Sequence, residues 1–87
     1  MRIEFHRSFK KQYKKAPLKI RFQFDERLRL FGQHMFHPIL RNHALSGDRA
    51  GQWSINVTGD WRAVYVFGEK EGVVIFIDID THSNLYS

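Results

Sequence analysis

The side chains in this sequence that could do chemistry stand at the ends of its apolar segments. They are His43, Asp60, Arg62, His82 and Tyr86. A histidine transfers protons near neutral pH, an arginine holds a phosphate with a fixed fork of donors, and an aromatic ring stacks on a base. Metal-free RNA cleavage needs these groups, because a 2′-hydroxyl loses its proton, the phosphorane charge is held and the leaving oxygen gains a proton. A structural alternative stays open, since Asp60 can shape a turn and Arg62 can form an ion pair.

Other recognisable site chemistry is missing from the sequence. It has no glycine-rich nucleotide motif, no metal-protease helix and no Gly-x-Ser-x-Gly elbow. His34 and His37 are three residues apart but have no acidic partner nearby, so we interpret them as surface histidines rather than metal ligands. The absence of cysteine excludes a disulfide scaffold and Cys-ligated zinc. We therefore expect neither a metal nor another cofactor.

Positive charge is concentrated in the first half of the chain. Residues 1–44 contain eleven Lys or Arg against three Asp or Glu, a balance of +8, whereas residues 45–87 have a balance of −3. This asymmetry favours a polyanionic partner, nucleic acid before membrane. In that interpretation Lys10, Lys11 and Lys14 contact RNA phosphates, while a solvated basic helix face is the alternative.

Size and composition predict one small folded domain over residues 1–87. The 43% of hydrophobic and 15% of aromatic residues are typical of globular chains rather than disordered ones. A chain of this length has room for one core, so a substrate would bind on the surface or in a shallow groove. No apolar run is long enough to span a bilayer, and the first residues lack the apolar core of a signal peptide. We expect a soluble, cytoplasmic protein.

The order of the predicted elements indicates an α+β fold. A short strand over 2–5 precedes a helix with Ser8 as its candidate N-cap, a start one or two residues earlier being the alternative. Pro17 separates this helix from a second one over 18–35. Three to four strands follow, over 42–47, 52–57, 61–67 and 73–79. Helices in the first half and strands in the second predict an αα-hairpin packed on a mostly antiparallel sheet.

Alternation in the strand over 61–67 separates two of the candidate site residues. Trp61 lies on the same face as Tyr65 and Phe67, and Arg62 lies on the opposite face. An arginine beside strand-core residues needs a reason, because its charge is permanent and costly to bury. We therefore favour Arg62 over Trp61 as a residue that contacts substrate.

Three motifs resemble those of a known toxin superfamily. They are His43–Gly47, Gly59–Tyr65 and Thr81–Tyr86. In order and separation they are similar to the RelE/ParE superfamily of small bacterial toxins, and the final Thr-His-Ser-x-Leu-Tyr is most similar to its YafQ-like branch. The resemblance spans essentially the whole chain. It implies a RelE-like fold and the toxin of a type II toxin–antitoxin system, an mRNA interferase that cuts the codon in the ribosomal A site without a metal.

The same resemblance implies partners and residue roles. A cognate antitoxin would bind and block the toxin, which alone would be a monomer. His82 matches the family's late catalytic histidine, and Tyr86 matches its C-terminal aromatic residue. His43 matches an earlier histidine, and Arg62 matches the arginine that the wider superfamily uses against the scissile phosphate.

The sequence shares one further pair of residues with YafQ-like toxins and differs from their pattern at two positions. Asp60 and Trp61 match the Asp-Trp pair of YafQ-like members, with Asp60 expected to orient or assist a histidine and Trp61 to contact substrate. Asn56 stands where those members have a second histidine, and it cannot transfer a proton at neutral pH. Asp78 stands where they have a basic residue, and its charge would repel a phosphate.

These departures keep two other functions open. A ParE-like toxin that inhibits gyrase without catalysis, or an inactive RNA-binding relative, would tolerate both Asn56 and Asp78. The presence of His43 and His82 argues against them, because a toxin without proton-transfer chemistry has no need of these histidines.

Overall fold

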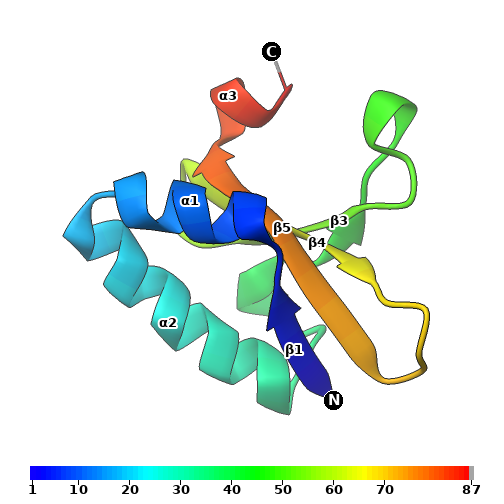
Figure 1. The fold of residues 1–87 in the computed structure, drawn as a ribbon. Helices are drawn as coiled ribbons and strands as arrows, with labels where there is room; N and C mark the ends of the chain where they lie inside the picture. The colour runs from blue at the N-terminus through cyan, green and yellow to red at the C-terminus, as the bar shows by residue number, and fades with distance from the viewer. Residues whose placement is uncertain (87) are drawn as a thin grey trace.

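The structure is a computed structural model and describes residues 1–86. Its elements follow in the order β1 (Arg2–Phe5), α1 (Arg7–Lys15), α2 (Leu18–Gln33), a 3-10 turn (Pro38–Leu40), β2 (His43–Ala44), a second 3-10 turn (Gly47–Arg49), β3 (Trp53–Asn56), β4 (Trp61–Phe67), β5 (Val73–Thr81) and α3 (His82–Tyr86) (Figure 1). No helix in this part of the chain is long and apolar enough to cross a membrane.

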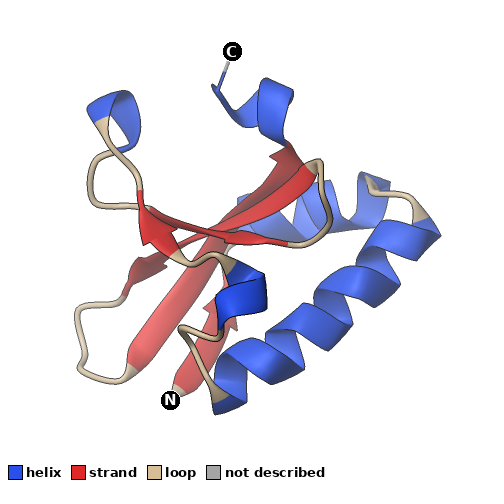
Figure 2. Cartoon of the chain, turned by 180° about the vertical axis from the view of Figure 1, so that it is seen from behind, coloured by secondary structure: helices blue, strands red, loops and turns tan. Residues whose placement is uncertain are grey.

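The predicted α+β architecture is confirmed. The strands form one five-stranded sheet in the order β1-β5-β4-β3-β2, antiparallel except for the parallel pair of β1 and β5. Figure 2 shows α1 and α2 together on one side of the sheet, with α3 beyond the end of β5. The helical hairpin therefore covers one face and leaves much of the opposite face to other segments.

The first helix begins before the predicted N-cap. His6 is the N-cap of α1, and its Nδ1 accepts a hydrogen bond from the backbone N–H of Ser8. The Ser8 hydroxyl instead donates to the carbonyl of Ile77 in β5, at 2.6 Å. This bond fastens α1 to β5 just beyond the point where β1 stops pairing with Phe76.

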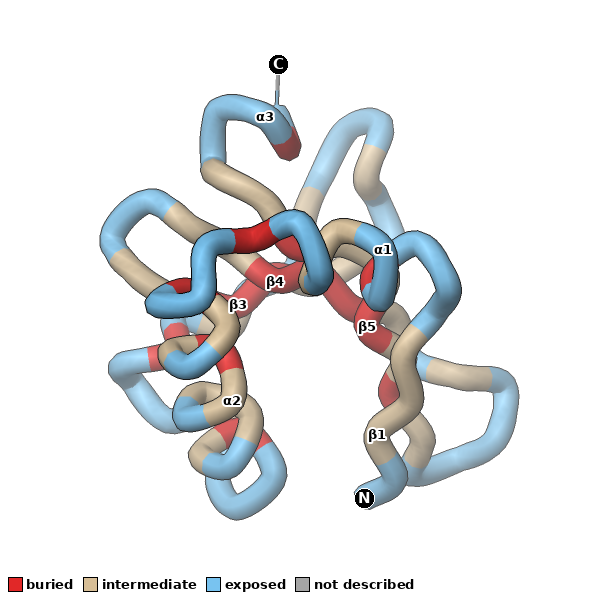
Figure 3. Tube along the Cα trace, turned by 60° about the vertical axis from the view of Figure 1, so that its left-hand side comes forward, coloured by how far each residue is buried: buried red, intermediate tan, exposed pale blue. Residues whose placement is uncertain are grey.

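Aromatic side chains make up the centre of the core. Phe76 of β5 packs against five other rings with centroid distances of 5.4–6.0 Å, and the partners are Phe5, Phe9, Phe24, Phe31 and Tyr65. Figure 3 shows buried positions along β4 and β5 and on α2. Apolar residues at helical spacing in α2 thus meet alternating residues of the sheet, which is the pattern that the sequence predicts.

A register shift in β5 decides which of its side chains face the core. Val64 pairs with Asp78, whereas Tyr65 pairs with Phe76, so Ile77 is an extra residue on the β5 side. The bulge lets both Phe76 and Ile79 enter the core and leaves Asp78 on the other face. The sequence predicts a strand over 73–79, and the structure extends it, because pairing with β4 continues to Thr81.

Two tyrosines should make stability fall at alkaline pH. Burial raises the pKa of Tyr65, and burial together with the Asp25 carboxylate raises the pKa of Tyr13. A raised folded-state pKa means that the unfolded chain loses its proton first, so this stability is complete below about pH 10 and is lost as the pH rises further. Urea unfolding at about pH 8 and about pH 11 measures the change. Tyr65→Phe should reduce the alkaline loss, and an equal loss in both proteins would contradict the assignment.

Candidate active site

An open groove of about 1100 Å³ lies on the sheet face opposite the aromatic core. Its lining combines β2 and the residues around it with the β3–β4 turn and α3: Arg41, Asn42, His43, Ala44, Leu45, Ser46, Asn56, Gly59, Arg62, His82 and Tyr86. Four of the residues predicted from the sequence, namely His43, Arg62, His82 and Tyr86, therefore line one cavity although they come from three separate segments.

The sheet register explains why Arg62 reaches the groove. Arg62 pairs with Asn56 of β3, and both line the groove. The next residue, Ala63, is fully buried in the core on the other face. Successive side chains of a strand point to opposite faces, so the burial of Ala63 directs Arg62 into the groove.

One nitrogen of Arg62 is held by the turn that precedes β4. Its Nη1 lies 3.0 Å from the carbonyl of Thr58, 3.2 Å from that of Gly59 and 3.1 Å from that of Trp61. Its Nε and Nη2 donate to no group among the described residues. The guanidinium is thus oriented by the backbone and keeps donors free for an anion, and Arg62 forms no structural ion pair within residues 1–86.

The backbone before β2 orients the ring of His43. Its Nδ1 lies 2.8 Å from the carbonyl oxygen of Arg41. A carbonyl only accepts, so Nδ1 carries the hydrogen and, in the neutral ring, Nε2 keeps its lone pair. Arg41 has a φ of 46°, the only positive value of a non-glycine among the described residues. Such left-handed geometry is uncommon outside glycine, and here it is found directly beside the groove.

The segment after β5 forms a short helix that carries two groove residues. His82 and Tyr86 are one turn apart on α3, and their rings meet edge to face with centroids 4.7 Å apart. The N–H of His82 donates to the carbonyl of Asp60 at 2.7 Å, and the Thr81 hydroxyl accepts the N–H of Asn84. The β3–β4 turn and α3 are therefore fastened together beside Arg62.

Comparison with known proteins identifies the family of this chain. The family model of the bacterial toxin YafQ, of type II toxin–antitoxin systems, matches residues 1–87. The chain belongs to the YafQ toxin family. No curated protein matches its sequence.

Solved structures share the fold of this toxin. E. coli YafQ has 21% identity, with 100% of both chains covered and a TM-score of 0.81. The YoeB/ParE toxin from Agrobacterium tumefaciens has 21% identity, with 94% of this chain and 99% of that chain covered and a TM-score of 0.76. YafQ in the E. coli DinJ–YafQ complex matches over 100% of both chains with 21% identity and a TM-score of 0.70.

Two predicted site residues of the toxin, Asp60 and Trp61, do not line the groove. The Asp60 side chain is exposed, and it is the backbone carbonyl of Asp60 that accepts a hydrogen bond from the N–H of His82. Trp61 is half-buried and packs against the hydrophobic core. Asp60 lies in the exposed β3–β4 turn, and Trp61 lies on the core face of β4 because successive side chains of a strand point to opposite faces.

The predicted RNA-binding lysines also lie elsewhere on the toxin. Lys10 and Lys14 line a separate apolar hollow of about 490 Å³ between α1 and α2, beside Tyr13 and Phe24. Lys11 is exposed and is not part of the groove lining. Any contact of these lysines with RNA would therefore be distinct from contacts inside the groove.

The two acidic residues near the end of β5 have structural partners. Asp78 pairs with Arg49, with 3.7 Å between Oδ2 and Nη2. Asp80 accepts hydrogen bonds from the N–H of Thr81 and the side-chain amide of Asn84. Neither carboxylate lines the groove, so the repulsion of phosphate expected from Asp78 is reduced by its cationic partner and its position.

Sequence reasoning identified His43 but missed Arg41 and Asn42, which precede it in the groove wall formed by residues 41–46. Arg41 adds a second cation to the groove, and its position two residues before His43 was the only available signal. Asn42 donates to the carbonyl of Met35 and accepts from the Tyr65 hydroxyl, so it holds this wall to the core. His37 is used locally, because its Nδ1 accepts the N–H of Ile39 in the first 3-10 turn. Among the described residues, no group of three or more His, Cys, Asp or Glu could hold a metal.

Proposed function

We propose that this toxin is a ribosome-dependent endoribonuclease that cleaves mRNA by metal-free attack of a 2′-hydroxyl. The observation that carries the proposal is the convergence of His43, Arg62, His82 and Tyr86 on one open groove. Two proton-transfer groups, a phosphate-binding cation and an aromatic ring are together what this reaction needs. Translating ribosomes as the target would place the toxin in the cytoplasm.

His43 is the general base in this mechanism. Its Nδ1–H donates to the Arg41 carbonyl, so Nε2 is available to remove the proton of the 2′-hydroxyl. The oxygen then attacks the neighbouring phosphorus. Asn56, which also lines the groove, contributes an amide donor or acceptor rather than a proton.

Arg62 stabilises the charge that develops on the phosphorane. Its Nη1 is held by the carbonyls of the β3–β4 turn, whereas Nε and Nη2 remain as donors toward phosphate oxygens. Because the guanidinium is already oriented, little reorganisation is required when charge develops, which is the condition for strong electrostatic catalysis.

His82 is the general acid, and Tyr86 binds the nucleotide. A protonated His82 gives its proton to the 5′ oxygen as the P–O bond breaks, which leaves a 2′,3′-cyclic phosphate and a 5′-hydroxyl. Tyr86 stacks on the adjacent base from the same helix face. Lys10, Lys11 and Lys14 lie outside the groove, so we assign them to phosphates of ribosomal RNA.

An antitoxin is the protein partner in this proposal. Support comes from the solved DinJ–YafQ complex of E. coli and the RelBE2 complex of Mycobacterium tuberculosis, both of which are toxin–antitoxin complexes. The antitoxin would bind the toxin directly, suppress cleavage and form a hetero-oligomer, whereas the toxin alone would be monomeric.

The proposal is tested with purified toxin on ribosomes that translate a defined mRNA, followed by mapping of the RNA ends. We expect wild-type toxin to produce new ends at codon positions, and the upstream fragments should end in a 2′,3′-cyclic phosphate, as attack by the 2′-hydroxyl requires. Arg62→Lys keeps the charge but loses the fork, so cleavage should fall by roughly tenfold. Arg2→Lys is the matched control, because the Arg2 side chain is exposed and, among residues 1–86, forms its ion pair with Glu4 alone.

Absence of codon-aligned ends with wild-type toxin would overturn the proposal. Inhibition of gyrase supercoiling by the same preparation would then favour the ParE-like alternative. Equal cleavage by wild type and Arg62→Lys would leave endonuclease activity in place but remove Arg62 from the mechanism.

A further inference from the structure

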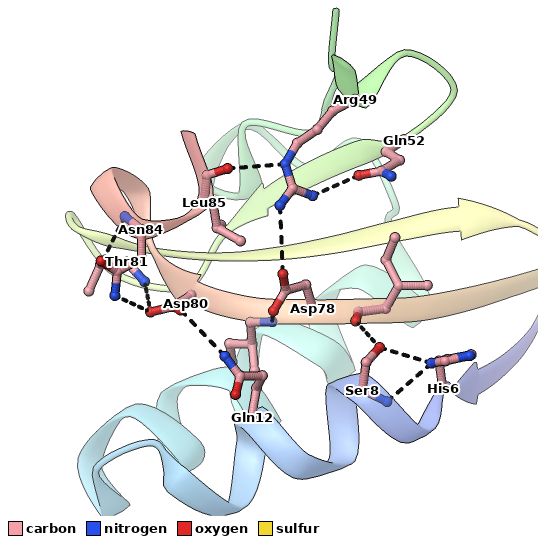
Figure 4. Close-up of polar contacts among 12 residues, drawn as sticks. His6, Ser8, Gln12, Arg49, Gln52, Asp78, Asp80, Thr81, Asn84 and Leu85 are labelled. Carbon is pink, nitrogen blue, oxygen red and sulfur yellow. Dashed lines mark hydrogen bonds and ion pairs between the residues drawn. The ribbon is translucent and has the colours of Figure 1, made fainter. Parts of the chain in front are cut away.

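Arg49 links three segments that are distant in the sequence (Figure 4). It lies in the second 3-10 turn, between β2 and β3. Its Nε donates to the carbonyl of Leu85 in α3 at 3.1 Å, and its Nη1 donates to the side chain of Gln52 at 2.8 Å. Its Nη2 faces the carboxylate of Asp78 in β5. All three guanidinium nitrogens therefore have a partner.

Helix α3 needs such a link, because a helix of one turn is unstable in isolation. Its N-terminal end is held by the bond from His82 to the Asp60 carbonyl. At the other end the Leu85 side chain is buried, but its carbonyl lies in the last turn and lacks an intrahelical partner. Arg49 supplies the partner, and its guanidinium carbon lies 6.0 Å from the centre of the Tyr86 ring.

Asp78 and Gln52 hold the guanidinium in place for this contact. The Arg49 and Asp78 side chains are only 25% and 28% exposed, so their attraction is less screened than that of a surface pair. Figure 4 shows Asp78 on the sheet below the guanidinium and Leu85 to its side, so that the plane of Arg49 spans the gap between β5 and α3. Neither the Asp78 carboxylate nor the Leu85 carbonyl belongs to a residue that lines the groove.

We propose that Arg49 is a positioning residue that holds α3 against the sheet and thereby keeps His82 and Tyr86 in the groove. The importance of this for RNA cleavage rests on the proposed function, but the effect on α3 does not. Arginine is required rather than any cation, because a lysine has no planar fork to reach the Leu85 carbonyl, Gln52 and Asp78 at once.

The test is NMR spectroscopy of the free toxin, with wild type compared to Arg49→Lys, Arg49→Met and Asp78→Asn. The readouts are the NOE between the rings of His82 and Tyr86 and the 15N relaxation of α3 amides. Both Arg49 variants should lose the ring NOE and show increased motion of α3. Asp78→Asn should keep the NOE, because the bonds to Leu85 and Gln52 remain. Arg29→Lys, on the exposed surface of α2, is the control and should match wild type.

Activity and folding are measured on the same proteins. Displaced proton-transfer groups should lower the cleavage rate of both Arg49 variants by roughly 10–100-fold, while the relaxation of β4 amides stays as in wild type. An unchanged ring NOE in Arg49→Met would overturn the proposal. Retention of the NOE in Arg49→Lys with loss in Asp78→Asn would also overturn it, since charge neutralisation alone would then explain the pair. If wild type cleaves no RNA, the proposed function fails, yet the NMR comparison still decides the role of Arg49.

Discussion

Replacing His82 by alanine is expected to lower ribosome-dependent RNA cleavage by about 10²–10⁴-fold, the range typical of a positioned acid or base. Alanine cannot protonate the leaving 5′ oxygen, and no other imidazole of α3 can substitute for it. Substrate binding should change much less, because Arg62 and Tyr86 stay in the groove. The loss should therefore appear in the rate of the chemical step rather than in the concentration of ribosomes needed for half-maximal cleavage.

Single-turnover cleavage on programmed ribosomes measures this effect. His34→Ala is the matched control, since His34 is exposed at the end of α2 and does not line the groove. The ring NOE is lost with His82 itself, so intact folding is checked by thermal unfolding. If His82→Ala cleaved as fast as His34→Ala, the assignment of His82 as general acid would be wrong.

Replacing Phe76 by alanine is expected to lower the free energy of unfolding by about 3–5 kcal/mol. Phe76 is fully buried in β5, where it contacts rings of β1, α1, α2 and β4. Truncation removes its apolar surface and leaves a cavity between the sheet and the helical hairpin, which a close-packed core cannot fill without strain. Because small domains are stable by only about 5–15 kcal/mol, this single truncation would remove a large part of the total stability.

Phe22 provides a matched control on α2. Its side chain is 62% exposed, so Phe22→Ala should change the free energy of unfolding by no more than about 0.5 kcal/mol. Urea denaturation of both variants, with a common m-value, gives the comparison. Similar losses for the two variants would contradict the packing described for β5.

Local patterns predicted most of the elements and the family. Alternation in β4 separates Arg62 from Trp61, and the observed register has the same arrangement, because the pleat depends only on neighbouring residues. Apolar residues recur at helical spacing in α2, and two of them, Phe24 and Phe31, are buried in the core. The three motifs of the resemblance led to the YafQ family, which the family model confirms over the whole chain.

Long-range pairing was beyond the reach of such patterns. The parallel contact of β1 with β5 joins residues from the two ends of the chain, and no local signal specifies it. The bulge at Ile77 is equally hidden, because it depends on how β5 meets β4 rather than on the β5 sequence. That Lys10 and Lys14 lie beside a hollow separate from the groove also follows from tertiary packing and could not be inferred from their spacing.

The sequence by itself determined the groups available for chemistry, namely two histidines, an arginine and a tyrosine near the ends of strands. Only the tertiary structure decided that they line one groove and that Asp60 and Trp61 do not. The segment after β5 is helical for the same reason, since so short a helix is stabilised by tertiary contacts rather than by intrinsic propensity. The contact of Arg49 with the Leu85 carbonyl joins residues 36 positions apart, and folding alone brings them together.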